Sequence, residues 1–141
     1  MTTLSRKCVP FTPFDRELAK STIAIVTAGG VHLKDQEPFN IADELGDLGF
    51  REIPPDVDSS RLMVTHHHYD HTDADADINV VFPIDVLRDL EAAGVIGGIA
   101  KKHIGYGYTM QLKAMYEGTA REIANDIDKG SHADVVVLTG G

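Results

Sequence analysis

The sequence of 141 residues contains no tryptophan and only one cysteine, Cys8. A single cysteine cannot form an intrachain disulfide, a Cys-x-x-Cys redox pair or a thiolate zinc cluster within one polypeptide. The sequence also lacks an apolar run close to the roughly 20 residues of a membrane-spanning helix, and residues 1–7 lack the apolar core of a signal peptide. We therefore expect a cytoplasmic protein with no membrane span.

Basic residues are also scarce, with 13 Lys and Arg against 22 Asp and Glu and a formal net charge of −9. No basic run is present that would follow a phosphate backbone, so we expect no nucleic-acid partner. The remaining composition is that of a folded globular protein, because 43% of the residues are hydrophobic and 25% are charged. Length and composition predict a single domain over residues 1–141.

Short β-branched runs alternate with segments of helical periodicity, which predicts a mostly parallel sheet covered by helices. One helix is expected over about 84–93, because Pro83 suits its first turn and Gly94 its end. A second is expected over 110–128, where apolar residues recur at steps of three and four. The expected fold class is α/β, with a three-layer, mostly parallel open sheet that resembles half of a Rossmann-like or flavodoxin-like domain. Strands are expected at residues 22–27, 61–65 and 96–103, from 134 onward, and as an edge strand at 50–53.

The segments that follow parallel strands meet at one edge of the sheet, where ligands of open α/β sheets bind. Six of the seven histidines lie in such segments, and His132, which precedes a strand, is expected at the opposite edge. Two glycines after the first strand form a tight turn or admit a phosphate or carboxylate close to the backbone. The converging segments are 28–32, 65–71, 103–108 and 139–141. The candidate residues for substrate binding or proton transfer are Thr27, Gly29, Gly30, His32, His66, His67, His68, Asp70, Thr139, Gly140 and Gly141.

Residues 65–71 contain the spacing His-x-His-x-Asp-His directly after an expected strand. This spacing resembles the zinc motif of metallo-β-lactamase-fold hydrolases, in which His66 and His68 would hold one Zn²⁺ and Asp70 and His71 a second. That fold is larger than this chain and needs more ligands downstream. The alternatives are a polar loop whose imidazoles cap strand ends, and a noncatalytic module that binds a small molecule.

Most of the chain resembles the selenoprotein B family of glycine, sarcosine, betaine and D-proline reductases. The most specific match is the run Asp-Ile-Asn-Val-Val-Phe-Pro-Ile-Asp at 77–85. The start of the chain, with 9–13 just ahead of the first strand, is more similar to the small selenoprotein subunit of D-proline reductase. The other matching stretches are 27–34, 50–54, 87–90, 94–96, 122–124 and 134–139.

The resemblance implies reductive cleavage of a C–N bond at the α-carbon of a small amino acid. A pyruvoyl group on a partner subunit would hold the substrate amine as an iminium, a selenolate or thiolate directly after Gly141 would attack, and a thiol reductant or thioredoxin-like donor would resolve the intermediate. No cofactor is expected in this chain itself. Residues 1–141 would then be the amino-terminal part of a longer subunit, cut at a UGA codon, and inactive alone.

The closing strand is strongly apolar, with the sequence Val-Val-Val-Leu at 135–138. An uncovered face of such a strand costs several kcal/mol at about 25 cal/mol per Å² of apolar surface. We therefore expect an oligomer, or another partner, over that face.

Overall fold

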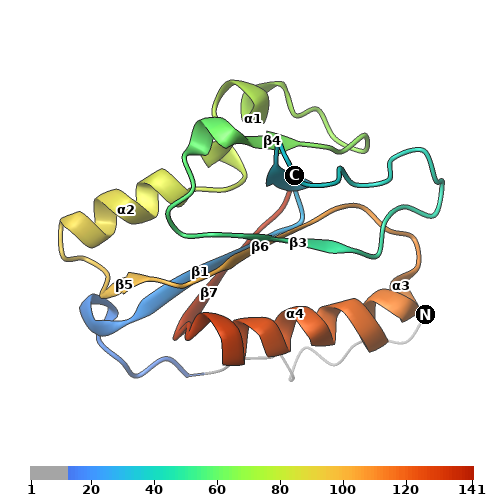
Figure 1. Cartoon of the computed structure of the whole chain (residues 1–141). Helices are drawn as coiled ribbons and strands as arrows, with labels where there is room; N and C mark the ends of the chain where they lie inside the picture. Colours follow the sequence, from blue (N-terminus) through green and yellow to red (C-terminus); the bar gives the residue numbers. More distant parts are fainter. Residues whose placement is uncertain (1–12) are drawn as a thin grey trace, which may run out of the picture.

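A five-stranded sheet arranged around the strand β1 organises the chain, of which the computed structural model describes residues 13–141 (Figure 1). β1 is parallel to β7 along one edge, and to β5 and then β6 along its other edge. β3 is antiparallel to β6 and lies at the edge of the sheet, as expected for residues 50–53. The strands are β1 (Thr22–Thr27), β3 (Phe50–Ile53), β5 (Gly98–Ile99), β6 (His103–Tyr106) and β7 (Val135–Thr139).

Both faces of the sheet are covered, because the central strand β1 is apolar on both sides. Ile23 and Ile25 join a core with the helix α2 (Ile84–Ala92), whereas Ala24 and Val26 join a second core with the helix α4 (Ala120–Asp126). Figure 1 shows α2 above the sheet and α4 below it. The expected α/β fold with a mostly parallel sheet is confirmed, as a mixed sheet between helices. The Rossmann-like or flavodoxin-like assignment stays a prediction.

Both predicted helices are present. α2 follows Pro83 and ends before Gly94, which has a φ of +68°. The second forms one helical stretch that includes α4 and ends at His132, whose φ is 55°. Its other parts are α3 (Leu112–Ala114) and two π-helical segments, η4 (Met115–Thr119) and η5 (Ile127–Ser131). No helix among residues 13–141 has the length and apolar character needed to cross a bilayer.

Two expectations about strands are corrected. Residues 61–65 form β4 (Leu62–Val64), but β4 pairs antiparallel with β2 (Val31–Leu33) in a separate two-stranded sheet. The strand expected at 96–103 is divided into β5 and β6, because the chain leaves the ladder between them and the Lys101 N–H donates to Ser131 O at 3.2 Å. At the start of β6, the His103 side chain accepts the Ile25 N–H through Nδ1 at 2.9 Å.

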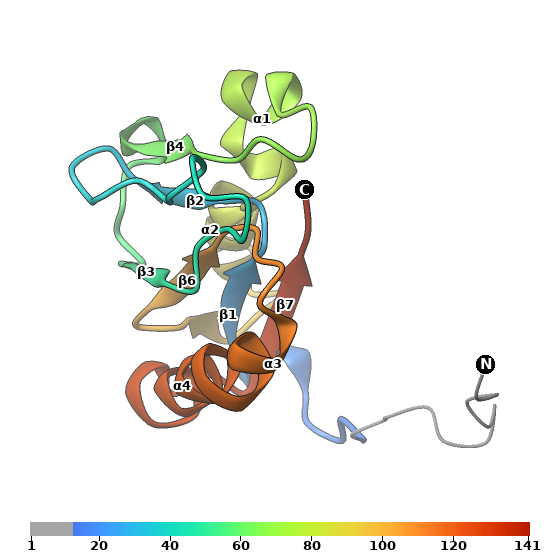
Figure 2. The same cartoon turned by 90° about the vertical axis from the view of Figure 1, so that its right-hand side faces the viewer.

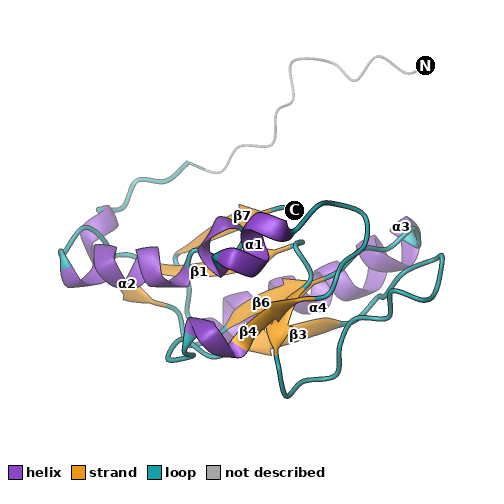
Figure 3. Ribbon diagram, turned by 90° about the horizontal axis from the view of Figure 1, so that it is seen from above, coloured by secondary structure: helices purple, strands orange, loops and turns teal. Residues whose placement is uncertain are grey.

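The smaller sheet lies above the main sheet, on the side of β3 and β6 (Figure 2). The short helix α1 (Thr72–Ala76) lies beside it, and the last residues of the chain run up next to α1 (Figure 3). Residues 13–141 also contain the single-turn 3₁₀ helices η1 (Leu18–Lys20), η2 (Ser59–Arg61) and η3 (Ile78–Val80). This arrangement places the histidine segment above the main sheet.

Candidate functional site

Four segments that are distant in sequence meet above the carboxyl end of β1, and we call this region the rim. Backbone hydrogen bonds join them: Gly30 N–H donates to Tyr106 O at 3.0 Å, and Thr65 N–H donates to Gly30 O at 2.9 Å. Ala28 N–H donates to Thr139 O at 2.9 Å. The expected convergence is therefore observed, but the histidine segment reaches the rim from the smaller sheet and not from a parallel strand of the main one. The rim consists of residues 28–30, 65–71, 107–108 and 139–141.

The turn after β1 is fixed by small residues. Gly30 has a φ of +71°, and a Cβ there would lie 2.5 Å from Thr65 O, so only glycine fits. Thr27 is buried, and its Oγ1 accepts the Gly29 N–H at 3.1 Å. Thr139 Oγ1 donates to Val81 O at 2.6 Å. The hydroxyl groups of Thr27 and Thr139 thus bond to backbone atoms of the protein itself, so we assign these residues a structural role in the rim.

Tyr69 connects the turn after β1 with the end of β7. Its hydroxyl donates to Gly29 O at 2.8 Å, and its ring lies against Gly141 so closely that a Cβ at Gly141 would collide with it. Burial, and then the charge of Asp75, raise the pKa of Tyr69, so the phenol is protonated at neutral pH. Sequence reasoning missed this residue. The available signal was an aromatic residue in a polar segment directly after a strand.

The three consecutive histidines form an aromatic cluster with tyrosines. The ring of His66 lies 4.7 Å from that of Tyr69, and the ring of His68 lies 3.5 Å from that of Tyr108, between centroids. The rings of His67 and His68 are 4.0 Å apart. Tyr108 was a second residue that was not among the candidates.

The protonation of His66 follows from its surroundings. Burial lowers its pKa, and the neighbouring His68, His67 and His71 lower it further. His66 Nδ1 accepts the His68 N–H at 3.1 Å, so the neutral ring carries its proton on Nε2. At neutral pH His66 is therefore an uncharged imidazole with a fixed tautomer, beside the phenol of Tyr69.

Asp70 and His71 point to α1 and not to the other histidines. Asp70 Oδ1 accepts both the Thr72 N–H at 3.0 Å and the Thr72 hydroxyl at 2.6 Å, and these bonds lower its pKa. His71 Nδ1 lies 2.8 Å from Asp75 Oδ2. Among residues 13–141, no three His, Cys, Asp or Glu side chains are placed to hold one metal ion. This geometry does not favour the zinc-hydrolase alternative.

The three remaining histidines lie away from the open rim. His32 is fully buried; its Nδ1–H donates to Leu33 O at 2.7 Å, and its Nε2 accepts from Thr65 Oγ1 at 2.8 Å. This position favours a structural role over contact with substrate. The expectation that residues 103–106 belong to the edge segment is wrong, because His103 begins β6 and is buried in the core, where desolvation lowers its pKa to about 4. His132 precedes β7, at the opposite edge as expected.

The rim thus contains imidazoles and phenols, which can transfer protons, beside the exposed residues Gly140 and Gly141. Imidazoles and phenols can bind a carboxylate and deliver a proton to a leaving amine. Residues 13–141 contain no thiol, since Cys8 lies outside the described residues. The described rim therefore has acid–base groups but no strong nucleophile.

Comparison with known proteins identifies the relatives of the chain. Residues 3–141 match the family Glycine/sarcosine/betaine reductase selenoprotein B. The chain is 42% identical to D-proline reductase subunit gamma of Acetoanaerobium sticklandii, over 93% of this chain and 53% of that protein. It is 36% identical to glycine reductase complex component B subunit gamma of Symbiobacterium thermophilum, over 93% of this chain and 31% of that one. It is 33% identical to sarcosine reductase complex component B subunit beta of Peptoclostridium acidaminophilum, over 94% and 31% respectively.

The chain therefore spans about half the length of the D-proline reductase relative, and 31% of each of the other two. No solved structure matches the chain significantly.

Proposed function

Because the chain belongs to the glycine/sarcosine/betaine reductase selenoprotein B family, we propose that it acts in a complex that reductively cleaves the C–N bond at the α-carbon of a small amino acid. D-proline is the favoured substrate, since the D-proline reductase relative is 42% identical and the glycine reductase relative 36%. Glycine, sarcosine and betaine are the alternatives. The observation that carries the proposal is the family match over nearly the whole chain, together with the rim that gathers acid–base groups around Gly141.

We place the reactive group in the turn that follows β7. Support comes from Tyr69, whose ring packs on Gly141 and whose hydroxyl is bound to the turn after β1 at 2.8 Å. A selenocysteine or cysteine continuing from Gly141 starts beside this ring. Its anion is the nucleophile that such a reduction needs, because the ionised form of a selenol or thiol attacks carbon.

The histidines and Tyr69 of the rim have separate roles in the proposed reduction. A pyruvoyl group on a partner subunit would hold the substrate amine for cleavage. The nucleophile attacks the α-carbon, the C–N bond breaks with its electron pair leaving on nitrogen, and the amine takes up a proton. The protonated Tyr69, whose ring contacts Gly141, and the Nε2–H of His66, whose ring lies 4.7 Å from that of Tyr69, are the proton donors, and the exposed His67 and His68 bind the substrate carboxylate. A thiolate then attacks the selenium or sulfur that is bound to the α-carbon, and this bond breaks with its electron pair on carbon, which takes up a proton and releases the product. A thiol donor of thioredoxin type reduces the resulting selenenylsulfide or disulfide as its own two thiols become a disulfide.

The test is reduction of D-proline by this chain together with its partner subunits and dithiothreitol. Cleavage at the α-carbon opens the ring and forms 5-aminopentanoate, which mass spectrometry detects. We expect product from the coding region expressed with its continuation beyond codon 141 under selenocysteine insertion, and none from the 141-residue chain. Product formed equally by the 141-residue chain would place the nucleophile elsewhere, and no product from either chain with any of the four substrates would overturn the proposed function.

A further inference from the structure

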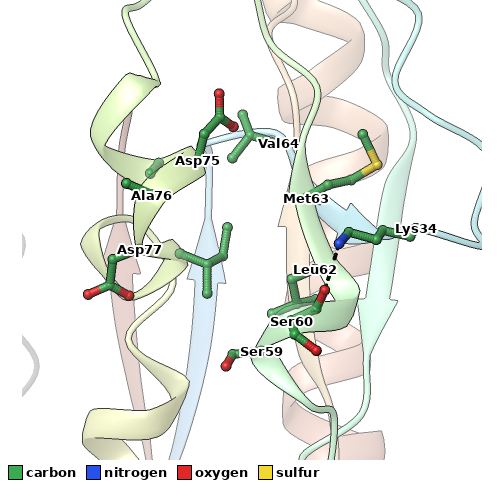
Figure 4. Close-up of a pocket in the computed structure, with 11 residues that line it drawn as sticks. Lys34, Ser59, Ser60, Leu62, Met63, Val64, Asp75, Ala76 and Asp77 are labelled. Atoms are coloured by element: carbon green, nitrogen blue, oxygen red, sulfur yellow. Dashed lines mark hydrogen bonds between the residues drawn. The ribbon is translucent and has the colours of Figure 1, made fainter.

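A groove separates β4 from α1, on the side of β4 that faces away from β2. Its volume is about 490 Å³, and the proposed reduction uses none of it. Figure 4 shows Leu62, Met63 and Val64 of β4 along one wall, and Asp75, Ala76 and Asp77 along the opposite wall. Lys34 Nζ donates to Ser60 O at 2.7 Å at the same wall as β4, so this amine is already engaged.

β4 offers unused backbone groups to this groove. The Lys34 N–H donates to Arg61 O and the Thr65 N–H to Gly30 O, which makes 34/61 and 30/65 hydrogen-bonded pairs of the antiparallel ladder with β2. Because such pairs alternate, His32 and Met63 form the next hydrogen-bonded pair, and Leu62 and Val64 direct their N–H and C=O groups away from β2.

Only one of these outward groups has a partner within residues 13–141. The Leu62 N–H donates to Ser59 O. The Val64 N–H and the carbonyls of Leu62 and Val64 have none among the described residues, since β4 pairs with β2 alone. As whole residues, Leu62 and Val64 are only 5% and 7% exposed, so their side chains anchor the strand, and the groove runs along its edge. An anchored strand with an open edge is the template that β-augmentation uses.

We propose that this groove binds an extended segment of a partner protein as a third strand beside β4. An antiparallel segment exchanges two hydrogen bonds with Val64 and gives a third to the Leu62 carbonyl. Alternate side chains of the segment then face the groove, where Ala74 and Ile78 are apolar.

The negative charge of the groove wall favours a partner segment that is basic. The wall opposite β4 carries the exposed Asp75 and Asp77, Asp73 lies on the same short helix, and the chain has a net charge of −9. The partner segment therefore carries lysine or arginine between its apolar positions. This inference does not depend on the reductase activity, because it rests on the edge of β4 and the charge of α1 alone.

The test uses the ¹⁵N-labelled chain and two synthetic peptides of equal length, acetyl-Lys-Val-Arg-Val-Lys-Val-amide and the same peptide with glutamate at each basic position. We expect the basic peptide to shift the Val64 and α1 amide signals saturably and to slow exchange of the Val64 amide hydrogen at least tenfold. The acidic peptide leaves both unchanged. An unchanged Val64 amide, or equal binding of the two peptides, overturns the proposal.

Three variants test whether the basic peptide binds in the groove or is only attracted by the negative charge of the whole chain. Asp75→Asn removes one charge from the wall and should weaken the basic peptide several-fold, whereas Asp89→Asn removes the same charge from the exposed side of α2 and should leave its affinity unchanged. Ala76→Arg, at an exposed position of the wall, should abolish binding while the other amide signals keep their positions. Equal effects of Asp75→Asn and Asp89→Asn would contradict a site in this groove.

Discussion

His103 is the first residue of β6, and its ring takes the place of a backbone acceptor for β1. Its Nδ1 accepts the Ile25 N–H at 2.9 Å, and its Nε2 is buried without a partner among the described residues. Burial, with a smaller effect of the Arg88 charge, lowers its pKa to about 4. The pKa of a histidine in the unfolded chain is about 6.5. Between about pH 4 and this value the unfolded state therefore binds more protons than the folded state.

The free energy of unfolding should therefore fall as the pH drops from about 6.5 to about 4, and level off below that, by on the order of 3 kcal/mol for this group. Urea unfolding across this pH range measures the effect. His103→Asn is the control, because its amide oxygen can accept the Ile25 N–H but does not titrate. Acidification should destabilise the variant much less, and the same pH dependence in both proteins would contradict this role for His103.

Tyr69 should hold the end of β7 in place through its ring and not through its hydroxyl. Tyr69→Phe loses the hydrogen bond to Gly29 O, which costs about 1 kcal/mol of stability, but keeps the packing on Gly141. Tyr69→Ala loses both. We expect the ¹⁵N heteronuclear NOE of the Gly141 amide to drop in Tyr69→Ala and to stay near the wild-type value in Tyr69→Phe.

Tyr116 provides the matched control, because it is 72% exposed and lies on the helical stretch away from Gly141. Tyr116→Ala should leave the Gly141 signal unchanged. A Gly141 amide that is equally ordered in Tyr69→Ala would show that the ring does not position this turn.

At the scale of the element, β7 has an open apolar side. Val136 is 38% exposed and Leu138 is 76% exposed, and both border a groove of about 310 Å³ with Ile123 and Ile127 of the long helical stretch. Val135 and Val137 point the other way and pack against the α2 core. The expectation of a partly open strand face is thus confirmed for one face. Within residues 13–141, β7 also has no partner strand beyond β1.

We predict that the 141-residue chain self-associates through this face, because an uncharged, exposed edge strand favours pairing with another copy. Sedimentation velocity over a range of concentrations should show a rising mean mass. Leu138→Lys should shift the chain towards monomer without unfolding it, and Leu112→Lys, at a leucine that is 71% exposed on α3, should not. A wild-type chain that stays monomeric at every concentration would contradict this prediction.

The sequence predicts some elements better than others. An element is predicted well when the residues that define it are its own neighbours in sequence, and poorly when they are distant. α2 is bounded by Pro83 and Gly94, which act locally, and its observed span of Ile84–Ala92 nearly equals the expected one. The strand at Leu62–Val64 was also recognised from its own residues, but its pairing with Val31–Leu33 depends on contacts between distant segments. The division of β5 from β6 likewise depends on distant residues, because Ser131 O accepts the Lys101 N–H between the two strands and the Ile25 N–H bonds the His103 ring at the start of β6.

The residues of the candidate site were likewise predicted only in part from the sequence. The histidine segment and the glycine turn were recognised because their residue types are unusual in sequence. Tyr69 was not, since its importance arises only when Gly29 and Gly141 lie on either side of it. His32 was expected at the site because of its position after a strand, whereas in the structure it belongs to β2, which pairs with β4, and its buried ring bonds Leu33 and Thr65.

At the scale of the whole molecule, the described chain has the features of one component of an assembly. The rim holds acid–base groups without a thiol, β7 exposes an apolar face, and β4 has a free edge beside an acidic helix. The related proteins are subunits of reductase complexes and extend beyond the matched region. The apolar face of β7 and the free edge of β4 are each able to pair with further polypeptide.

The most direct measurement is the nucleotide sequence of the gene past the codon for Gly141, read in the same frame. We predict UGA or a cysteine codon at the next position, followed by an open frame with a further cysteine codon nearby. That result would place the nucleophile beside Tyr69. A UAA or UAG codon there, any other sense codon, or a UGA with no open frame after it would contradict a reactive residue directly after β7.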